Sequence, residues 1–382
     1  MLGGGNPAVI PKIMNIFREE LQALIDHENI NQHLGYYSSP QGDAPFIDAL
    51  VNFLNERYPW NLSGKNIALT NGSQQSFFYL FNLFAGKMPD GKQKKILFPL
   101  SPEYIGYMDL GLSDDMFASC KPDIKYLGKQ QFKYHINFNE LTIDDHIAAI
   151  CVSRPTNPTG NVIANEELQK LEKLSQQNNI PLIIDNAYGL PFPGAIYTNA
   201  ELHWHDNIIL GMSLSKLGLP GVRTGIVIAH ENIINAISQL NGITCLAPNN
   251  IGAGILTRLL HDRRIIDLRE NIIRPFYQQK MQRALALAQT TFKDLPVYIH
   301  KPEGAFFLWL WCKDLSITSK ALYKKLKARK VFVIPGEDFF IDIDPSWQHQ
   351  YQCLRLNYAL SENQLERGIN IIAEEIRKHL KE

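Results

Sequence analysis

Short apolar runs alternate with amphipathic stretches between about residues 66 and 229, and this rhythm is the strongest constraint on the fold. The runs are too short for helices and rich in isoleucine, which is typical of strands buried on both faces. Between two of them lies a predicted helix at 166–177, with Asn165 as the expected N-cap. Strands that alternate with helices predict an α/β domain with a mostly parallel sheet. The expected strands lie at 67–69, 96–98, 147–152, 182–184, 208–210 and 225–228.

The C-terminal third has a different pattern. Strands are expected at 306–311, 331–334 and 353–358, and helices at 320–328 and 362–380. This mixture predicts a smaller α+β domain. A chain of 382 residues is long for one simple core, so two domains are expected.

The charge balance excludes several classes of partner. Lys and Arg number 38, as do Asp and Glu, so nothing favours a nucleic-acid or anionic-membrane surface. No signal peptide opens the chain, and no apolar run approaches the roughly 18 residues of a membrane span. The five cysteines are scattered without metal-ligand spacing, and the pair His203 and His205 is a weak signal, so no metal is expected. The cytoplasm is the predicted location.

Polar residues follow four of the predicted strands. Asn71, Asn157, Asp185 and Ser213 each come at or just after the end of an apolar run. Because ligands gather at the carboxyl ends of parallel strands, we expect these residues to meet at one edge of the sheet. Lys216 follows Ser213 closely and is expected there too.

This set of residues fits pyridoxal phosphate. The Lys216 amine can condense with the cofactor aldehyde, and Asp185 can keep the pyridine nitrogen protonated. Tyr188 and Asn157 can donate hydrogen bonds to the ring phenolate. Each residue alone has an ordinary structural interpretation, but their order before Lys216 favours the cofactor. A buried Asp185 should also have a cationic partner.

A phosphate site is predicted beside the lysine. Gly72, Ser73 and Gln74 join a strand to an aromatic helix at 77–84, where backbone N–H groups attract an anion. The alternative is an ordinary strand-to-helix turn. Ser213 can add a hydroxyl and Arg223 a guanidinium to the same phosphate.

Four stretches then connect the chain to a known family: residues 2–7 (LGGGNP), 68–74 (ALTNGSQ), 97–107 (LFPLSPEYIGY) and 300–307 (HKPEGAFF). With the lysine motif, they make the chain resemble the fold-type I pyridoxal-phosphate enzymes of the class I and II aminotransferase group. Within that group it resembles the bacterial valine–pyruvate aminotransferases from end to end. Members of that subfamily usually carry an N-terminal arm before the GGGNP segment, which here begins at Gly3. Either the arm is absent or the chain starts further upstream.

The resemblance implies a domain division and a shared active site. Residues 1–45 would fold with residues 281–382 as the small domain, around a large cofactor domain at 46–280. Tyr104 would stack on the cofactor, although packing within a loop is an alternative role. Tyr37, with Tyr36 as the competing candidate, would reach the phosphate of the neighbouring subunit in a homodimer.

The resemblance also implies a substrate site. Arg355 would bind the substrate α-carboxylate with its planar fork, assisted by Asn157 and by the backbone of Gly5. The alternative is a surface arginine on the polar side of its strand.

The predicted function is a ping-pong transamination. An apolar amino acid, L-valine, would give its amino group to a keto acid, pyruvate, which leaves as alanine. A different aminotransferase specificity and a carbon–sulfur lyase are alternatives on the same cofactor. A ligand-sensing regulator is disfavoured because no DNA-binding segment precedes Gly3.

Overall fold

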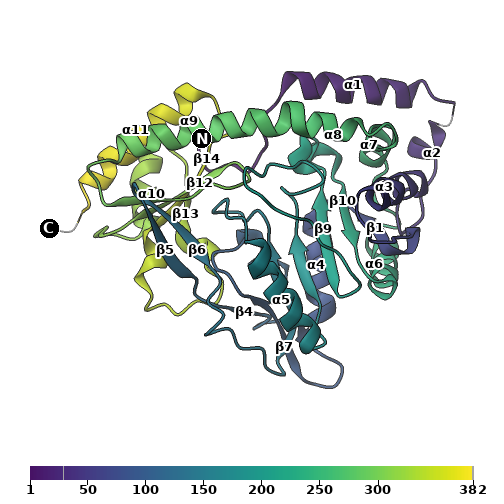
Figure 1. Cartoon of the computed structure of the whole chain (residues 1–382), viewed down its shortest axis with the longest axis horizontal. Coiled ribbons are helices and arrows are strands. Elements are labelled where there is room, and N and C mark those ends of the chain that lie inside the picture. Colours follow the sequence, from purple (N-terminus) through teal and green to yellow (C-terminus); the bar gives the residue numbers. More distant parts are fainter. Residues whose placement is uncertain (29, 381–382) are drawn as a thin grey trace.

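The six predicted strands, together with β2 and β4, which were not predicted, form an eight-stranded sheet of order β1-β10-β9-β8-β7-β3-β2, with β4 beside β3. The computed structural model describes residues 1–28 and 30–380 (Figure 1). The strands from β9 through β8, β7 and β3 to β4 are parallel, whereas β10 is antiparallel to both β9 and β1. The prediction of a mostly parallel sheet is therefore confirmed. The strands are β1 (Ile67–Thr70), β2 (Gly86–Lys87), β3 (Gln93–Phe98), β4 (Phe117–Ser119), β7 (Ile147–Ser153), β8 (Leu182–Asp185), β9 (Ile208–Ser213) and β10 (Gly225–Ile228).

Helices cover both faces of this sheet. Successive strand residues point to opposite faces, so Leu182 and Ile184 of β8 enter one hydrophobic core while Ile183 enters another. The first core also receives side chains of α3, α5 and α7, and the second those of α4 and α6. Burial on both faces explains why the strands are continuously apolar. The helices are α3 (Ala44–Arg57), α4 (Ser73–Phe84), α5 (Asn165–Gln177), α6 (Glu231–Thr244) and α7 (Ile251–His261).

A second, six-stranded sheet has the order β13-β14-β12-β11-β6-β5. Its strands are antiparallel except at β6 and β11, where Gln131 lies opposite Ile299. β5 and β6 come from within the range 46–280, so two strands of the predicted large unit belong to this sheet. The domain limits themselves stay a prediction. The strands are β5 (Asp123–Gly128), β6 (Gln131–His135), β11 (Val297–His300), β12 (Phe307–Cys312), β13 (Ile334–Pro335) and β14 (Cys353–Asn357).

The N-terminal segment lies along the second sheet. The Leu2 N–H donates to the Phe332 carbonyl at 2.7 Å, and the Asn357 N–H donates to the Leu2 carbonyl at 2.7 Å. The predicted strand at 331–334 is wrong except for Ile334, which belongs to β13. In a longer strand, the Phe332 carbonyl would accept a hydrogen bond from a neighbouring strand, but here it accepts one from the Leu2 N–H.

Helices join the two sheets on the outside. α8 (Arg264–Leu268), a π-helical turn (Arg269–Ile273) and α9 (Arg274–Thr291) follow one another and form a long rod in Figure 1. The rod contacts α7 at one end and α11 (Glu362–Arg377) at the other. α1 (Pro11–Ile25) packs on α7, and α10 (Ser319–Ala328) packs on α11. Within residues 1–28 and 30–380, none of the helices combines the length and apolarity that a membrane span needs.

Helix α5 begins one residue earlier than the sequence indicates. Ala164 is its N-cap and Asn165 its first residue, so the predicted capping role of Asn165 is wrong. The Asn165 amide oxygen instead accepts hydrogen bonds from Arg154 Nη2 at 2.6 Å and from the Glu201 N–H at 3.1 Å. The Ala164 N–H donates to the Glu167 carboxylate at 3.1 Å.

Candidate active site

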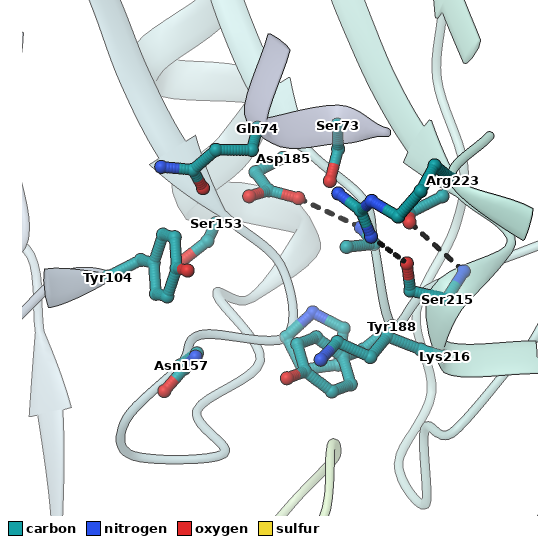
Figure 2. A pocket seen from close by; sticks show the side chains of 13 residues that line it. Ser73, Gln74, Tyr104, Ser153, Asn157, Asp185, Tyr188, Ser215, Lys216 and Arg223 are labelled. Atoms are coloured by element: carbon teal, nitrogen blue, oxygen red, sulfur yellow. Dashed lines mark hydrogen bonds between the residues drawn. The ribbon is translucent and has the colours of Figure 1, made fainter. Parts of the chain in front are cut away.

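A small cavity of about 140 Å³ lies at the carboxyl edge of the first sheet (Figure 2). β7, β8 and β9 all end there, as the parallel topology requires. Most of the predicted site residues line this cavity. The lining residues are Ser73, Gln74, Tyr104, Ser153, Pro155, Asn157, Asp185, Ala187, Tyr188, Ser213, Ser215, Lys216 and Arg223.

Lys216 lies in a short turn directly after β9. Its Nζ donates to the Gly5 carbonyl at 2.8 Å and lies 5.3 Å from the centre of the Tyr188 ring. Burial, followed by the nearby charge of Arg355, lowers the pKa of Lys216 to about 8. A buried ammonium loses hydration and is repelled by the guanidinium, so the neutral, nucleophilic amine is favoured.

Asp185 ends β8 and points into the cavity (Figure 2). Its Oδ1 accepts from the Ala187 N–H at 2.9 Å, and its Oδ2 accepts from the Tyr107 hydroxyl at 2.7 Å. Burial raises the pKa of the carboxyl, and the bond from Tyr107 opposes that shift. Among the described residues no Lys or Arg forms an ion pair with Asp185, and the charge of Lys216 acts on the carboxyl without such a contact.

These contacts fit a protonated pyridine ring. A buried carboxylate without a cationic partner is unfavourable, and the N–H⁺ of such a ring supplies the missing charge. The Tyr188 hydroxyl is also buried and has no hydrogen-bond partner among the described residues. Asp185 can therefore accept a further hydrogen bond, which the pyridine N–H⁺ would donate. The Tyr188 hydroxyl can donate one, which the ring phenolate would accept.

The predicted phosphate end of the site comprises Gly72, Ser73, Gln74, Ser213 and Arg223. Ser73 and Gln74 open α4, where free N–H groups favour an anion. Ser213 Oγ accepts from the Ser215 N–H at 3.2 Å, and Arg223 Nη1 donates to Ser215 Oγ at 3.3 Å. Ser215 therefore belongs to this end as well. Ser215 lies within the Ser213–Lys216 motif, but the motif alone does not indicate that its hydroxyl accepts from Arg223.

Two glycines allow the phosphate end to close. Gly72 has φ +89°, and a Cβ there would lie 2.2 Å from Arg223 Nη2. A Cβ on Gly225 of β10 would lie 2.6 Å from the Ser73 nitrogen. Any side chain at either position would displace the arginine or the start of α4.

The predicted carboxylate end comprises Gly5, Asn157 and Arg355. Arg355 lies on β14 in the second sheet, buried, with its guanidinium 4.4 Å from the centre of the Phe307 ring. Its Nη1 donates to Asn157 Oδ1 at 2.7 Å, and its Nη2 donates to the Gly3 carbonyl at 2.7 Å. The structure thus brings Arg355 and Asn157 together and adds Gly3, whose backbone role left no signal in the sequence. Burial lowers the pKa of Arg355 to about 10.

Two predicted tyrosines differ in position. Tyr104 lines the cavity and meets Tyr107 edge-on, with ring centres 5.3 Å apart. Tyr37 is 82% exposed and does not line the cavity of its own chain. Its expected contact with a neighbouring subunit stays a prediction. Tyr107 is buried and donates to Asp185, but the sequence analysis did not identify it as a site residue, although it lies only three positions after Tyr104 in the same stretch.

Comparisons of sequence and of structure each match the chain to aminotransferases over nearly its whole length. The family model for class I and II aminotransferases matches residues 4–372. Valine–pyruvate aminotransferase of Escherichia coli (strain K12) is 51% identical over 378 residues, which cover 99% of this chain and 91% of that protein. The crystal structure of valine–pyruvate aminotransferase from Salmonella typhimurium LT2 has a TM-score of 0.93 at 49% identity, covering 99% of this chain and 95% of that one. A putative amino-acid aminotransferase from Psychrobacter arcticum 273-4 has a TM-score of 0.97 at 46% identity, covering 99% and 91%.

Proposed function

Because the chain belongs to the class I and II aminotransferase family, we propose that it transfers the amino group of L-valine to pyruvate and releases alanine. The family match supports the transamination. The choice of valine and pyruvate is supported by the 51% identity to the Escherichia coli enzyme that is named for them.

Pyridoxal phosphate is the cofactor. When bound, it supplies an aldehyde for the amino group and a ring that accepts electrons from the substrate Cα. We assign the phosphate to the phosphate end of the cavity, now including Ser215, and the ring to Tyr104, Asn157, Asp185 and Tyr188. One observation supports this assignment most strongly: Lys216 and Asp185 face one cavity, the first with a lowered pKa and the second without an ion pair among the described residues.

Lys216 is proposed to move the proton. Burial lowers the pKa of its amine to about 8, which favours the neutral form that a base needs. Once the incoming amino acid has displaced Lys216 from the cofactor, the Nζ of Lys216 is free. It can then accept the proton from the substrate Cα and donate that proton to another atom in the same cavity. Asp185 would hold the proton on the ring nitrogen throughout, since its carboxylate has only neutral hydrogen-bond donors among the described residues.

Arg355 and Asn157 are proposed to bind the substrate α-carboxylate. The Arg355 fork already points two N–H groups at oxygen atoms, those of Asn157 and Gly3. A planar guanidinium matches a carboxylate in shape and charge, and the buried position strengthens the contact. Gly5 would assist through its backbone.

We also propose a cytoplasmic homodimer with shared active sites. Tyr36 and Tyr37 are 72% and 82% exposed, although tyrosine rings are costly to leave in water. Contact with a second copy would cover them and bring Tyr37 to the partner's phosphate end. The described cysteines are all free, which suits a reducing compartment.

The visible spectrum of the purified protein tests the proposal. Its absorption band from lysine-bound cofactor should bleach on addition of L-valine and return on addition of pyruvate. A band that does not respond to valine would contradict the substrate assignment alone. No band, even after addition of pyridoxal phosphate, would contradict the role of Lys216.

A further inference from the structure

Asn157 lies on a closed turn that follows β7. The Gly160 N–H donates to the Thr156 carbonyl at 2.8 Å, and the Thr156 N–H donates to the Asn161 carbonyl at 2.8 Å. Gly160 has φ +68°, and a Cβ there would lie 2.7 Å from the Gly304 carbonyl oxygen. The turn is therefore internally fixed and packed tightly against the segment that joins β11 to β12.

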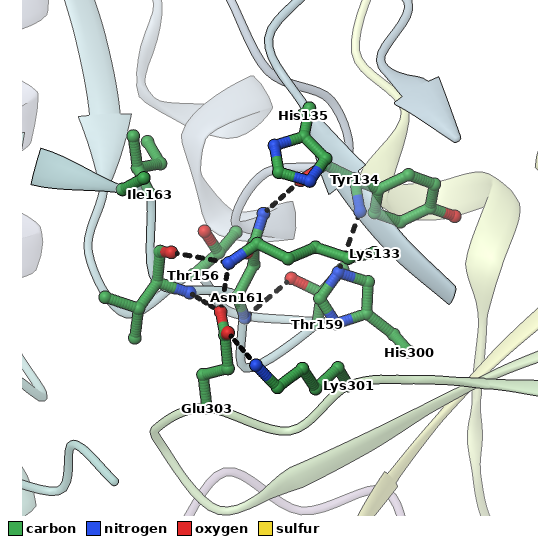
Figure 3. Close-up of polar contacts among 12 residues, drawn as sticks. Lys133, Tyr134, His135, Thr156, Thr159, Asn161, Ile163, His300, Lys301 and Glu303 are labelled. Carbon is green, nitrogen blue, oxygen red and sulfur yellow. Dashed lines mark hydrogen bonds and ion pairs between the residues drawn. The ribbon is translucent and has the colours of Figure 1, made fainter. Parts of the chain in front are cut away.

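Glu303 on that segment attaches the turn to the second sheet (Figure 3). Its backbone N–H donates to the Gly160 carbonyl at 3.0 Å, and its Oε2 accepts from the Val162 N–H at 3.3 Å. The same oxygen accepts a short hydrogen bond from Lys133 Nζ of β6. Lys133 Nζ also donates to the Val162 carbonyl at 3.0 Å, so both charged side chains hold the end of the turn.

The pair is deeply buried. The side chains of Lys133 and Glu303 are 11% and 5% exposed. Lys301 also donates to Glu303, at 2.8 Å, but its side chain is 47% exposed and makes no contact of its own with the turn. Burying a charged pair gains little in stability compared with apolar residues, so its retention suggests a role in geometry.

We propose that Glu303, together with Lys133, is a positioning residue for substrate binding: the pair fixes the turn so that Asn157 stays in register with Arg355. Arg355 belongs to the second sheet, whereas Asn157 leaves the first sheet at the end of β7. The Arg355 hydrogen bond contacts Asn157 itself, whereas the Lys133–Glu303 pair holds the far end of the same turn against the second sheet. The inference rests on the proposed function, because it assigns the α-carboxylate to Arg355 and Asn157.

The first test is Glu303→Gln, which keeps the shape and removes the charge. KM should rise about tenfold for both the amino acid and the keto acid, while kcat changes less than threefold, roughly as expected for a small displacement of a binding group. Equilibrium binding of 3-methylbutanoate, which has the carboxylate but no amino group, should weaken by the same factor. The affinity for pyridoxal phosphate should fall by a smaller factor than the affinity for 3-methylbutanoate, because Asn157 is one of several proposed cofactor contacts and the phosphate end is untouched.

A second variant guards against misfolding. Lys133→Met/Glu303→Gln removes both charges, so no buried lysine is left unpaired. It should fold and show the same rise in KM. Lys301→Met, which removes the exposed contact, and Glu20→Gln, which weakens the ion pairs of a buried α1 carboxylate with Arg258 and Arg264, should leave KM and 3-methylbutanoate binding unchanged.

Three results would overturn the inference. These are an unchanged KM in both Glu303 variants, an equal loss of cofactor and carboxylate affinity, or an equal effect of Lys301→Met. Failure of the proposed function is visible separately, as a wild-type spectrum that does not respond to valine. In that case, the KM of each variant is compared with the wild-type KM for the amino acid that the wild type does use.

Discussion

The phosphate end and the carboxylate end of the cavity are built in different ways. At the phosphate end, two hydrogen bonds join residues two and eight positions apart: the Ser215 backbone N–H donates to Ser213 Oγ, and Arg223 Nη1 donates to Ser215 Oγ. At the carboxylate end, Arg355 bonds to residues 198 and 352 positions away. The first end is assembled on one sheet, from the start of α4 and the turns after β9, whereas the second exists only when both sheets and the N-terminal segment have come together. The difference predicts that a substitution at the phosphate end mainly lowers cofactor affinity, and that one at the carboxylate end mainly lowers substrate affinity.

Lys216 lies between the two ends, and its removal should have the largest effect. Lys216→Ala should lower turnover at least about 10⁴-fold, because both the covalent anchor and the proton carrier are lost. The variant should still bind the cofactor without a covalent bond through the phosphate end. Single-turnover rates and cofactor retention on a desalting column measure the two effects. Unimpaired transamination would contradict the assignment.

Arg355→Ala should damage only the carboxylate end. Truncation of a buried, hydrogen-bonded charge costs about 2–5 kcal/mol, so the apparent affinities for valine and pyruvate should fall together by about 10²-fold or more. Binding of the cofactor should change little. Steady-state kinetics at saturating cofactor measure the affinities. If both remain unchanged, Arg355 is not part of the substrate site.

Arg223→Ala should give the converse result. Loss of a hydrogen bond to a charged group costs about 1.5–3 kcal/mol, so cofactor affinity should fall about 10–100-fold. With cofactor in excess, KM for valine should return to the wild-type value. Fluorescence titration of the cofactor-free protein with pyridoxal phosphate measures the affinity. A KM that stays high at saturating cofactor would show that the two ends are coupled.

The pKa of Lys216 is sensitive to both ends and should show the smallest effect. Neighbouring guanidinium groups disfavour the ammonium form, and Arg355 contributes more to the shift than Arg223 does. In the cofactor-free protein, the rate of reaction with a simple aldehyde should rise as pH increases through about 8 and then level off. Arg355→Met should move that midpoint to higher pH, and Arg223→Met should move it in the same direction by less. A midpoint that moves to lower pH in either variant contradicts this electrostatic account.

The same contrast explains what the sequence could predict. Asn157, Asp185 and Ser213 were placed together correctly because parallel strands bring their carboxyl ends to one edge. Gly3, Tyr107 and the Lys133–Glu303 pair were missed because their contacts depend on segments distant in the chain, which no local pattern records. The strand expected at 331–334 failed for a similar reason, since Leu2 bonds to Phe332 from the far end of the sequence.

The space beside Gly225 has a consequence for mutational scanning. This residue of β10 bonds to no proposed ligand, yet a single added methyl would press on the start of α4. A scan of all substitutions would record Gly225 as intolerant, alongside Lys216 and Asp185. Activity scores alone would then assign a chemical role to Gly225, which is needed only because it has no side chain. A parallel measurement of cofactor affinity would distinguish this steric role from the chemical roles of Lys216 and Asp185.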